Sequence, residues 1–142
     1  EMGLCVADLP GAGAAGAMGA GAVAFFGAAL KPGIETVLDT VHFEERIAGA
    51  DFVITGEGRL DCQSLRGNVV IGVARWAKKA GIPVLAVVGD IGDGIDEAYN
   101  EGVSAVFSTN RLAIPFSEAK LRSKQDYRLT IENLLRLIQT MQ

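Results

Sequence analysis

The stretch "DFVITGEGRLDCQSLRGNVVIGVARWAKKAGIPVLAVVG" spans residues 51–89 and contains a complete strand, helix and strand pattern. Residues 51–55 and 82–89 are short apolar runs rich in Val and Ile, which is typical of strands buried on both faces. Between them, residues 68–81 place apolar side chains on one helix face and end with two lysines and a glycine, the residues that favour a helix C-terminus. This order predicts a βαβ unit with parallel strands.

The alternation continues on both sides of this unit. A short helix is predicted before Gly102, a third strand over 103–109 and a terminal helix over 117–141, while residues 34–41 show the spacing of an amphipathic helix. The elements together predict an α/β fold of the three-layer Rossmann-like type, with a parallel or mostly parallel sheet between flanking helices.

The same pattern suggests a division of the chain. We expect residues 51–142 to form an α/β domain whose cleft is lined by the loop 55–68. We assign residues 1–50 separately, as a Gly/Ala-rich packing helix with connecting helices that could be part of a second domain.

Composition and charge narrow the class of protein. The chain has 142 residues, 49% of them apolar, and a formal net charge of −4 without any run of Lys or Arg, so neither nucleic acid nor a membrane is an expected partner. Cys5 and Cys62 lack the spacing of a metal site or a disulfide framework, and no signal peptide is visible, so we expect a cytoplasmic location. The abrupt start at Glu1 suggests a fragment.

Residues 10–30, "PGAGAAGAMGAGAVAFFGAAL", include the G-x-G-x-x-G pattern of a dinucleotide-binding turn, beginning at Gly11 and Gly13. Such a turn needs an acidic residue at the end of the following strand, whereas Glu35 and Asp39 lie on a predicted helix. We therefore favour a tightly packed, buried helix, whose first N–H groups could still receive an anion. A dinucleotide-dependent enzyme remains a further alternative.

The loop "TGEGRLDCQSLRGN" at residues 55–68 follows a predicted strand directly, which is where parallel sheets bind ligands. Six polar side chains fall within ten residues: Glu57, Arg59, Asp61, Gln63, Ser64 and Arg66. Acids can bind Mg²⁺ or accept a hydroxyl proton, and arginines can clamp a carboxylate or phosphate, so the set suits phosphoryl transfer to an acidic substrate. The alternative is a solvated loop whose opposite charges pair with one another.

A second acidic loop follows the next strand, "GDIGDGIDEA" at residues 89–98. A turn and a helix N-cap account for most of its acids, although Asp90 at the strand end could line the same cleft. No P-loop sequence occurs in the chain, so a kinase of the P-loop kind is excluded.

Four segments carry a resemblance to a known family: "PGAGAAGAMGAG", "LKPGIETVLD", "GADFVITGEGRLDCQSLRGN" and "GIPVLAVVGD". They resemble the C-terminal part of bacterial type I glycerate kinases, from about Leu9 to at least Phe107. The resemblance implies an enzyme that phosphorylates D-glycerate with ATP and Mg²⁺ in a cleft between two α/β domains. It also implies that the partner of this chain is the missing N-terminal portion of the same enzyme, and that the isolated chain is inactive. A homodimer is a further option.

The resemblance also implies roles for individual residues. Glu57 and Asp61 would be catalytic, with Asp61 also binding the metal. Four residues would bind substrate: Arg59, Gln63, Ser64 and Arg66. Independently of the resemblance, we expect Gly11 and Gly13, near the first helix turn, and Asp90, at a strand end, to bind the cofactor.

Two positions depart from the family pattern. Asn68 stands where the family typically has lysine, and Ala17 where it usually has glycine. The rival interpretation is a non-catalytic α/β module that binds an anion or a partner.

Overall fold

The computed structural model describes residues 5, 6, 8–64 and 68–141. Its helices and strands follow the chain in the order α1 Ala14–Phe26, α2 Gly33–Thr40, α3 Phe43–Ile47, β1 Val53–Thr55, β2 Arg59–Leu60, α4 Val69–Lys79, β3 Val84–Val88, β4 Asp90–Ile91, α5 Asp96–Asn100, β5 Val103–Ser108 and α6 Phe116–Thr140. Every helix and strand predicted from residue 34 onward forms within a few residues of its expected bounds.

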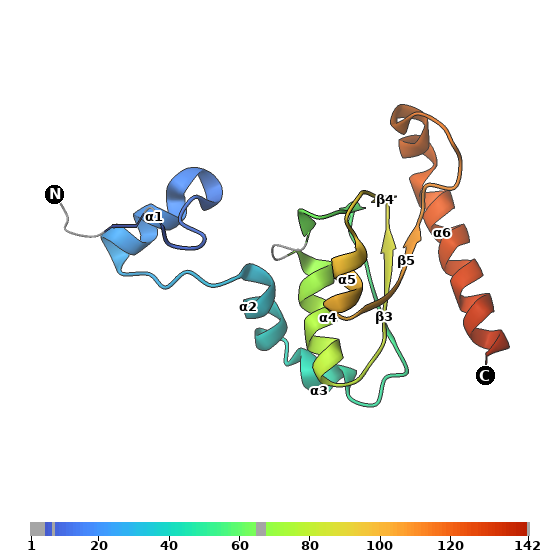
Figure 1. Cartoon of the computed structure of the whole chain (residues 1–142), viewed down its shortest axis with the longest axis horizontal. Helices are drawn as coiled ribbons and strands as arrows, with labels where there is room; N and C mark the ends of the chain where they lie inside the picture. The colour runs from blue at the N-terminus through green and yellow to red at the C-terminus, as the bar shows by residue number, and fades with distance from the viewer. Residues whose placement is uncertain (1–4, 7, 65–67, 142) are drawn as a thin grey trace.

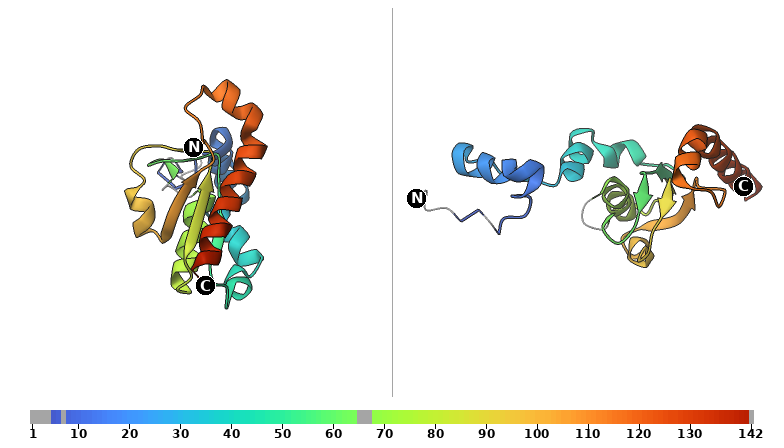
Figure 2. Two further views of the ribbon diagram at one scale, coloured as in Figure 1. Left: turned by 90° about the vertical axis from the view of Figure 1, so that its right-hand side faces the viewer. Right: turned by 90° about the horizontal axis from the view of Figure 1, so that it is seen from above.

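The main sheet has the order β1-β3-β5, and both strand pairs are parallel. Val84 at the start of β3 aligns with Val53 of β1 and Val103 of β5, and an irregularity in the second pairing follows it. Helix α4 covers one face of this sheet and α6 lies on the other (Figure 2, right). The predicted three-layer α/β class is confirmed.

The core lies between α4 and the sheet. Val70, Ile71 and Ala74 of α4 are fully buried and belong to one apolar cluster with Val84 and Val88 of β3. Removing such side chains from water is the main favourable term in folding. The helix face predicted from the sequence is therefore the face that packs on the sheet.

Helices α2 and α3 pack against α4 (Figure 1). A Cβ atom on Gly72 of α4 would overlap the side chain of Ile34, so the glycine lets α2 approach closely. Trp76 of α4 donates a 2.6 Å hydrogen bond from Nε1 to the Glu35 carboxylate of α2. The proposed domain boundary near residue 50 stays a prediction.

A second, two-stranded sheet was not predicted from the sequence. Strands β2 and β4 pair in parallel, with Arg59 opposite Asp90 and Leu60 opposite Ile91. Leu60 is fully buried and anchors this pair against the core. Both strands lie within segments that were predicted as loops.

The prediction of a buried helix over residues 14–30 is wrong for this chain. Helix α1 forms, but it has no buried residue, and Phe26 is 86% exposed. Figures 1 and 2 both show α1 apart from the sheet, joined by an extended segment. An apolar helix is buried only where another surface covers it, and the described residues supply no such surface to α1.

The start of α1 also departs from a regular helix. Ala15, Gly16 and Ala17 have left-handed φ angles of 51°, 67° and 69°, which interrupt the helix. None of the residues described before Gly11 forms a strand. Among the described helices, none is long and apolar enough to cross a membrane.

Candidate functional site

The candidate site lies at the carboxyl ends of the three parallel strands. Gly56 and Glu57 follow β1, Gly89 follows β3, and Thr109 follows β5. These ends lie side by side because the strands are parallel and adjacent. This edge of an open α/β sheet is where ligands bind.

Backbone hydrogen bonds hold the loop after β1 against the loop after β3. The amide of Gly89 donates to the carbonyl oxygen of Glu57 at 3.0 Å, and the amide of Gly92 donates to that of Leu60 at 2.8 Å. These bonds fix the backbone of the loop after β1, and the charged side chains of the loop extend from this fixed backbone.

Three charged residues of the sequence prediction meet at this position. Arg59 Nε lies 3.2 Å from Asp61 Oδ2, and its Nη1 atom lies 3.8 Å from Asp90 Oδ2. The other carboxylate oxygen of Asp61 accepts a 2.9 Å hydrogen bond from the amide of Gln63. Asp61 is thus held in one orientation, with an arginine between it and a second carboxylate.

Ser64 is 2% exposed. Its hydroxyl accepts a hydrogen bond from the amide of Asp61 at 3.2 Å and donates one to the carbonyl oxygen of Arg59 at 3.3 Å. This geometry shapes the turn that carries Asp61. The side chain of Gln63, in contrast, is exposed to solvent.

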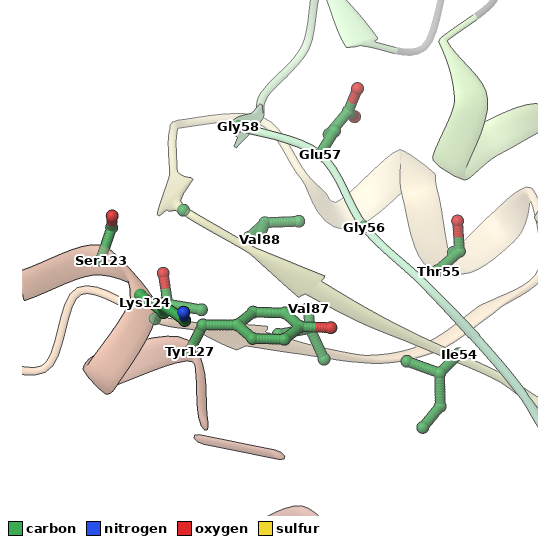
Figure 3. A pocket seen from close by; sticks show the side chains of 12 residues that line it. Ile54, Thr55, Gly56, Glu57, Gly58, Val87, Val88, Ser123, Lys124 and Tyr127 are labelled. Carbon is green, nitrogen blue, oxygen red and sulfur yellow. The ribbon is translucent and has the colours of Figure 1, made fainter. Parts of the chain in front are cut away.

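Glu57 is half-buried, and Figure 3 shows its carboxyl group directed away from the side chains of α6. No donor among the described residues reaches its Oε1 atom, which is shielded from water. This burial raises the pKa of Glu57, and the charge of Asp61 adds to the rise, while Asn68 and Ser64 act in the opposite direction. A carboxylate with a raised pKa is a stronger proton acceptor.

Three predicted site residues remain, Arg66, Gly11 and Gly13. Arg66 falls outside the described residues. Gly11 and Gly13 lie at the start of α1, which is separated from the strand ends in both views (Figures 1 and 2). The described chain therefore does not bring these two glycines to Glu57 and Asp61.

Two adjoining cavities open between the strand ends and α6, with volumes of about 550 and 640 Å³. They share Gly58, Gly89, Thr109 and Ser123. Figure 3 shows the first cavity, lined from α6 by Ser123, Lys124 and Tyr127.

The sequence analysis missed the part that α6 plays in lining these cavities. The terminal helix was predicted without any site residue, whereas residues 120, 123, 124 and 127 have the spacing of a single helix face. That spacing was the available signal for a polar face turned toward the cleft.

The oxygen donors of the site suit Mg²⁺ only in part. No group of three His, Cys, Asp or Glu side chains in the described part of the chain is arranged to hold a metal ion. Mg²⁺ commonly takes one or two carboxylates and completes its shell with water and phosphate oxygens. Asp61 and Asp90, on either side of Arg59, can meet that smaller requirement.

The fold and the site define an α/β protein with a cleft at the carboxyl ends of a parallel sheet. The model of the Glycerate kinase family matches residues 1–139, and the chain belongs to this family. The resemblance inferred from the sequence motifs is confirmed.

Individual relatives agree with this assignment. The chain is 51% identical over 108 residues to a glycerate kinase of Halalkalibacterium halodurans and 52% identical over 103 residues to a glycerate 2-kinase of Escherichia coli; these matches cover 76% and 72% of the chain. A crystal structure from Salmonella typhimurium LT2, assigned as a glycerate kinase 2, superposes on 96% of the chain with a TM-score of 0.70 and 40% identity. The chain spans only 28%, 27% and 35% of these three proteins, respectively.

Proposed function

We propose that this chain forms the part of an ATP-dependent kinase that presents catalytic carboxylates to D-glycerate. The observation that carries the proposal is the grouping of Glu57, Arg59 and Asp61 at the strand ends, in a chain that belongs to the Glycerate kinase family. The names of the relatives, a glycerate kinase and a glycerate 2-kinase, support glycerate as the acceptor.

The reaction needs a base, a cation for the substrate and neutralisation of phosphate charge. A glycerate hydroxyl oxygen bonds to the γ-phosphorus of ATP, the bond between that phosphorus and the leaving ADP oxygen breaks, and the hydroxyl proton passes to a carboxylate. We assign this proton to Glu57, because its pKa is raised, with Asp61 as the second candidate.

Asp61 suits a different task because it is already paired with a cation. We propose that it binds Mg²⁺, which would neutralise charge on the phosphates, with Asp90 beside it. Arg59 and Arg66 would hold the glycerate carboxylate or the transferring phosphoryl group, and Gln63 and Ser64 would support substrate binding. The roles of Gly11 and Gly13 in binding the cofactor remain predictions.

The acceptor hydroxyl and the cellular setting are further parts of the proposal. The Escherichia coli relative is named glycerate 2-kinase, which favours the hydroxyl at C2. Cys5 and Cys62 are both free and exposed, which supports a reducing cytoplasmic compartment. Because the chain spans only 28% and 27% of these two relatives, we propose that the remaining part of the enzyme is its partner. A homodimer stays a prediction.

One observation favours the rival function. Arg59 is paired with Asp61 and Asp90, as expected of a loop whose charges satisfy one another. A non-catalytic module that binds an anion would show the same pairing. The two functions differ in whether the carboxylates affect turnover.

A graft into a relative tests the kinase proposal. The matched segment of the Halalkalibacterium halodurans enzyme would be replaced by the corresponding residues of this chain, and ADP formation measured with and without D-glycerate. We expect glycerate-dependent turnover and 2-phosphoglycerate as the product by ³¹P NMR. A folded graft without turnover, beside an active parent enzyme, would contradict the proposal. A smaller graft of residues 51–110 serves if the larger one misfolds.

A further inference from the structure

Helix α1 exposes large apolar side chains on more than one side. Met18 is 70% exposed, Phe25 72% and Phe26 86%. Met18 and Phe25 are seven residues apart, which places them on the same side of the helix, whereas Phe26 lies about 100° around the helix axis from Phe25. Residues 10–30 contain no charged side chain, so no side of α1 is suited to contact with water. A helix that is apolar on all sides is normally surrounded by other elements.

A glycine within α1 indicates the same lack of a covering surface. A Cβ atom on Gly72 of α4 would overlap Ile34, so that glycine serves a contact within the described chain. A Cβ atom on Gly21, in the second half of α1, would have no neighbour among the described residues within 4 Å. Glycine destabilises a helix interior relative to alanine. Gly21 therefore leaves a space beside the helix backbone that no described residue fills.

The length of the relatives indicates where a covering surface comes from. The family model matches residues 1–139, so α1 belongs to the part that the family shares. The chain spans only 28%, 27% and 35% of three relatives, so the larger part of each relative lies outside the matched segment. The Salmonella structure superposes on 96% of the chain, so the superposed part includes at least half of α1. A large body of protein therefore accompanies α1 in these relatives.

A second copy of this chain fits α1 less well than such a body. Two copies related by a twofold axis present the same patch to each other, and that contact covers one side of each helix. It would leave in water either Phe26 or the side that carries Met18 and Phe25. A larger body can surround a helix on several sides, as the interior of a domain does.

We propose that α1 is the element through which this chain packs against the remaining part of the enzyme, with Phe25 and Phe26 buried in an apolar surface of that part. The extended segment between α1 and α2 holds α1 away from the sheet, where a second body has room to surround it (Figures 1 and 2). The inference rests on the partner named under the proposed function, and it adds the helix and the side chains that make the contact.

The same substitutions in two settings test the inference. Residues 10–141 of this chain would replace the corresponding segment of the Salmonella protein, and the melting temperatures of this graft and of the 142-residue chain would be measured. Phe25→Ala and Phe26→Ala should each lower the melting temperature of the graft by about 3 °C or more, as expected for a buried aromatic side chain, and change that of the 142-residue chain by less than about 1 °C.

Leu121→Ala on α6 is the matched control. Leu121 is 87% exposed, but it lies on a helix rich in charged residues, so the change should leave both melting temperatures unaltered. If the two Phe substitutions affect the graft no more than they affect the 142-residue chain, the inference is overturned.

Gly21→Ala should act in opposite directions in the two settings. In the 142-residue chain the added methyl group meets no neighbour and alanine favours the helix, so the melting temperature should stay the same or rise. In the graft the surface that covers α1 should clash with the methyl group and lower the melting temperature. An unchanged or higher melting temperature of the graft would contradict a covering surface on this side of α1.

A binding measurement serves if the graft misfolds. The 142-residue chain would be co-expressed with the remaining portion of the Salmonella protein, and the two should associate, with Phe25→Ala or Phe26→Ala weakening the association about tenfold or more. Lack of association, or association that ignores both changes, would overturn the inference. So would a dimer of the 142-residue chain that Phe26→Asp converts to a monomer while the graft tolerates Phe26→Ala, since α1 would then join two copies.

These readouts separate the inference from the kinase proposal, because none of them depends on turnover. A folded graft without turnover whose stability depends on Phe25 and Phe26 supports the docking of α1 and removes the kinase. Turnover in a graft that tolerates both Phe substitutions removes the docking and leaves the kinase.

Discussion

The amide of Gly89 donates a 3.0 Å hydrogen bond to the carbonyl oxygen of Glu57, and this bond ties the end of β3 to the loop after β1. The two segments approach so closely that a Cβ atom on Gly89 would lie 2.5 Å from the carbonyl oxygen of Gly58. The position of Glu57 therefore depends on a glycine more than thirty residues away in sequence.

Gly89→Ala should lower the free energy of unfolding by about 1–3 kcal/mol, the usual cost of forcing an extra carbon into a packed site. The added methyl group must push the loop away from β3, since backbone atoms oppose it. Urea unfolding followed by circular dichroism measures the change. Gly58→Ala is the matched control, because a methyl group there has no neighbour within 4 Å. Equal effects of the two changes would show that the close approach is unimportant.

The raised pKa of Glu57 predicts a pH dependence of stability. Above the ordinary carboxyl pKa of 4.5, the native state retains a proton on Glu57 that the unfolded state has lost, so the native state binds more protons. The free energy of unfolding contributed by this group therefore falls as the pH rises from about 4.5 through the native pKa. Glu57→Gln should remove that fall and increase stability at neutral pH, as measured by urea unfolding across this range.

Glu101 provides the opposite control. Its hydrogen bond with Arg75, whose Nε lies 2.6 Å from Oε2, lowers the pKa of Glu101. The stabilisation from Glu101 is present above its unfolded pKa and is lost as the pH falls through its native pKa. Glu101→Gln should therefore lower stability at neutral pH. If both substitutions move the pH profile in the same direction, the explanation from burial of Glu57 is wrong.

Asp61→Asn tests the proposed chemistry without disturbing the turn. The remaining side-chain oxygen can still accept the hydrogen bond from the amide of Gln63, while the negative charge is removed. In the active graft, kcat should fall at least ~10²-fold if this carboxylate acts on the proton or the metal. A kcat within threefold of the unsubstituted graft would exclude Asp61 from either role. Asp93→Asn in the neighbouring loop controls for charge alone.

The sequence predicted the main sheet well because the signals there were local. Residues 51–55 and 82–89 are nearly continuous apolar runs, and the apolar residues of α4 follow helical spacing. The two strands and the helix therefore form as predicted, with small changes at their ends. The pairing of β2 with β4 depends instead on contacts between distant loops. Neither Arg59 nor Asp90 has a high strand propensity, so the local sequence did not indicate that β2 pairs with β4.

The sequence grouped the charged residues of the candidate site in one loop, but it did not predict the α6 side chains that line the cavity. Glu57, Arg59 and Asp61 were found because they crowd one loop after a strand. Lys124 and Tyr127 were missed because helical spacing indicates that they share one face of α6, but it does not indicate that this face lies over the strand ends. The prediction that α1 is buried was wrong for a related reason. Its apolar composition indicates that another surface should cover the helix, but not which surface does so.

The contacts of α2 and α3 lead to a last prediction, about the domain boundary near residue 50. Leu38 and Ile47 are buried, and Ile34 fills the space left by Gly72 on α4. A chain of residues 51–142 should therefore unfold with a free energy at least about 2 kcal/mol lower than the complete chain, the lower end of the cost of losing one buried Leu or Ile side chain. A chain of residues 31–142 should match the complete chain in its free energy of unfolding, because α1 has no buried residue.

Trp76, the single tryptophan, reports on the contact between α2 and α4 through its hydrogen bond to Glu35, so its fluorescence should change only in the chain of residues 51–142. Equal stability of the 51–142 and 31–142 chains would instead support a boundary at residue 50.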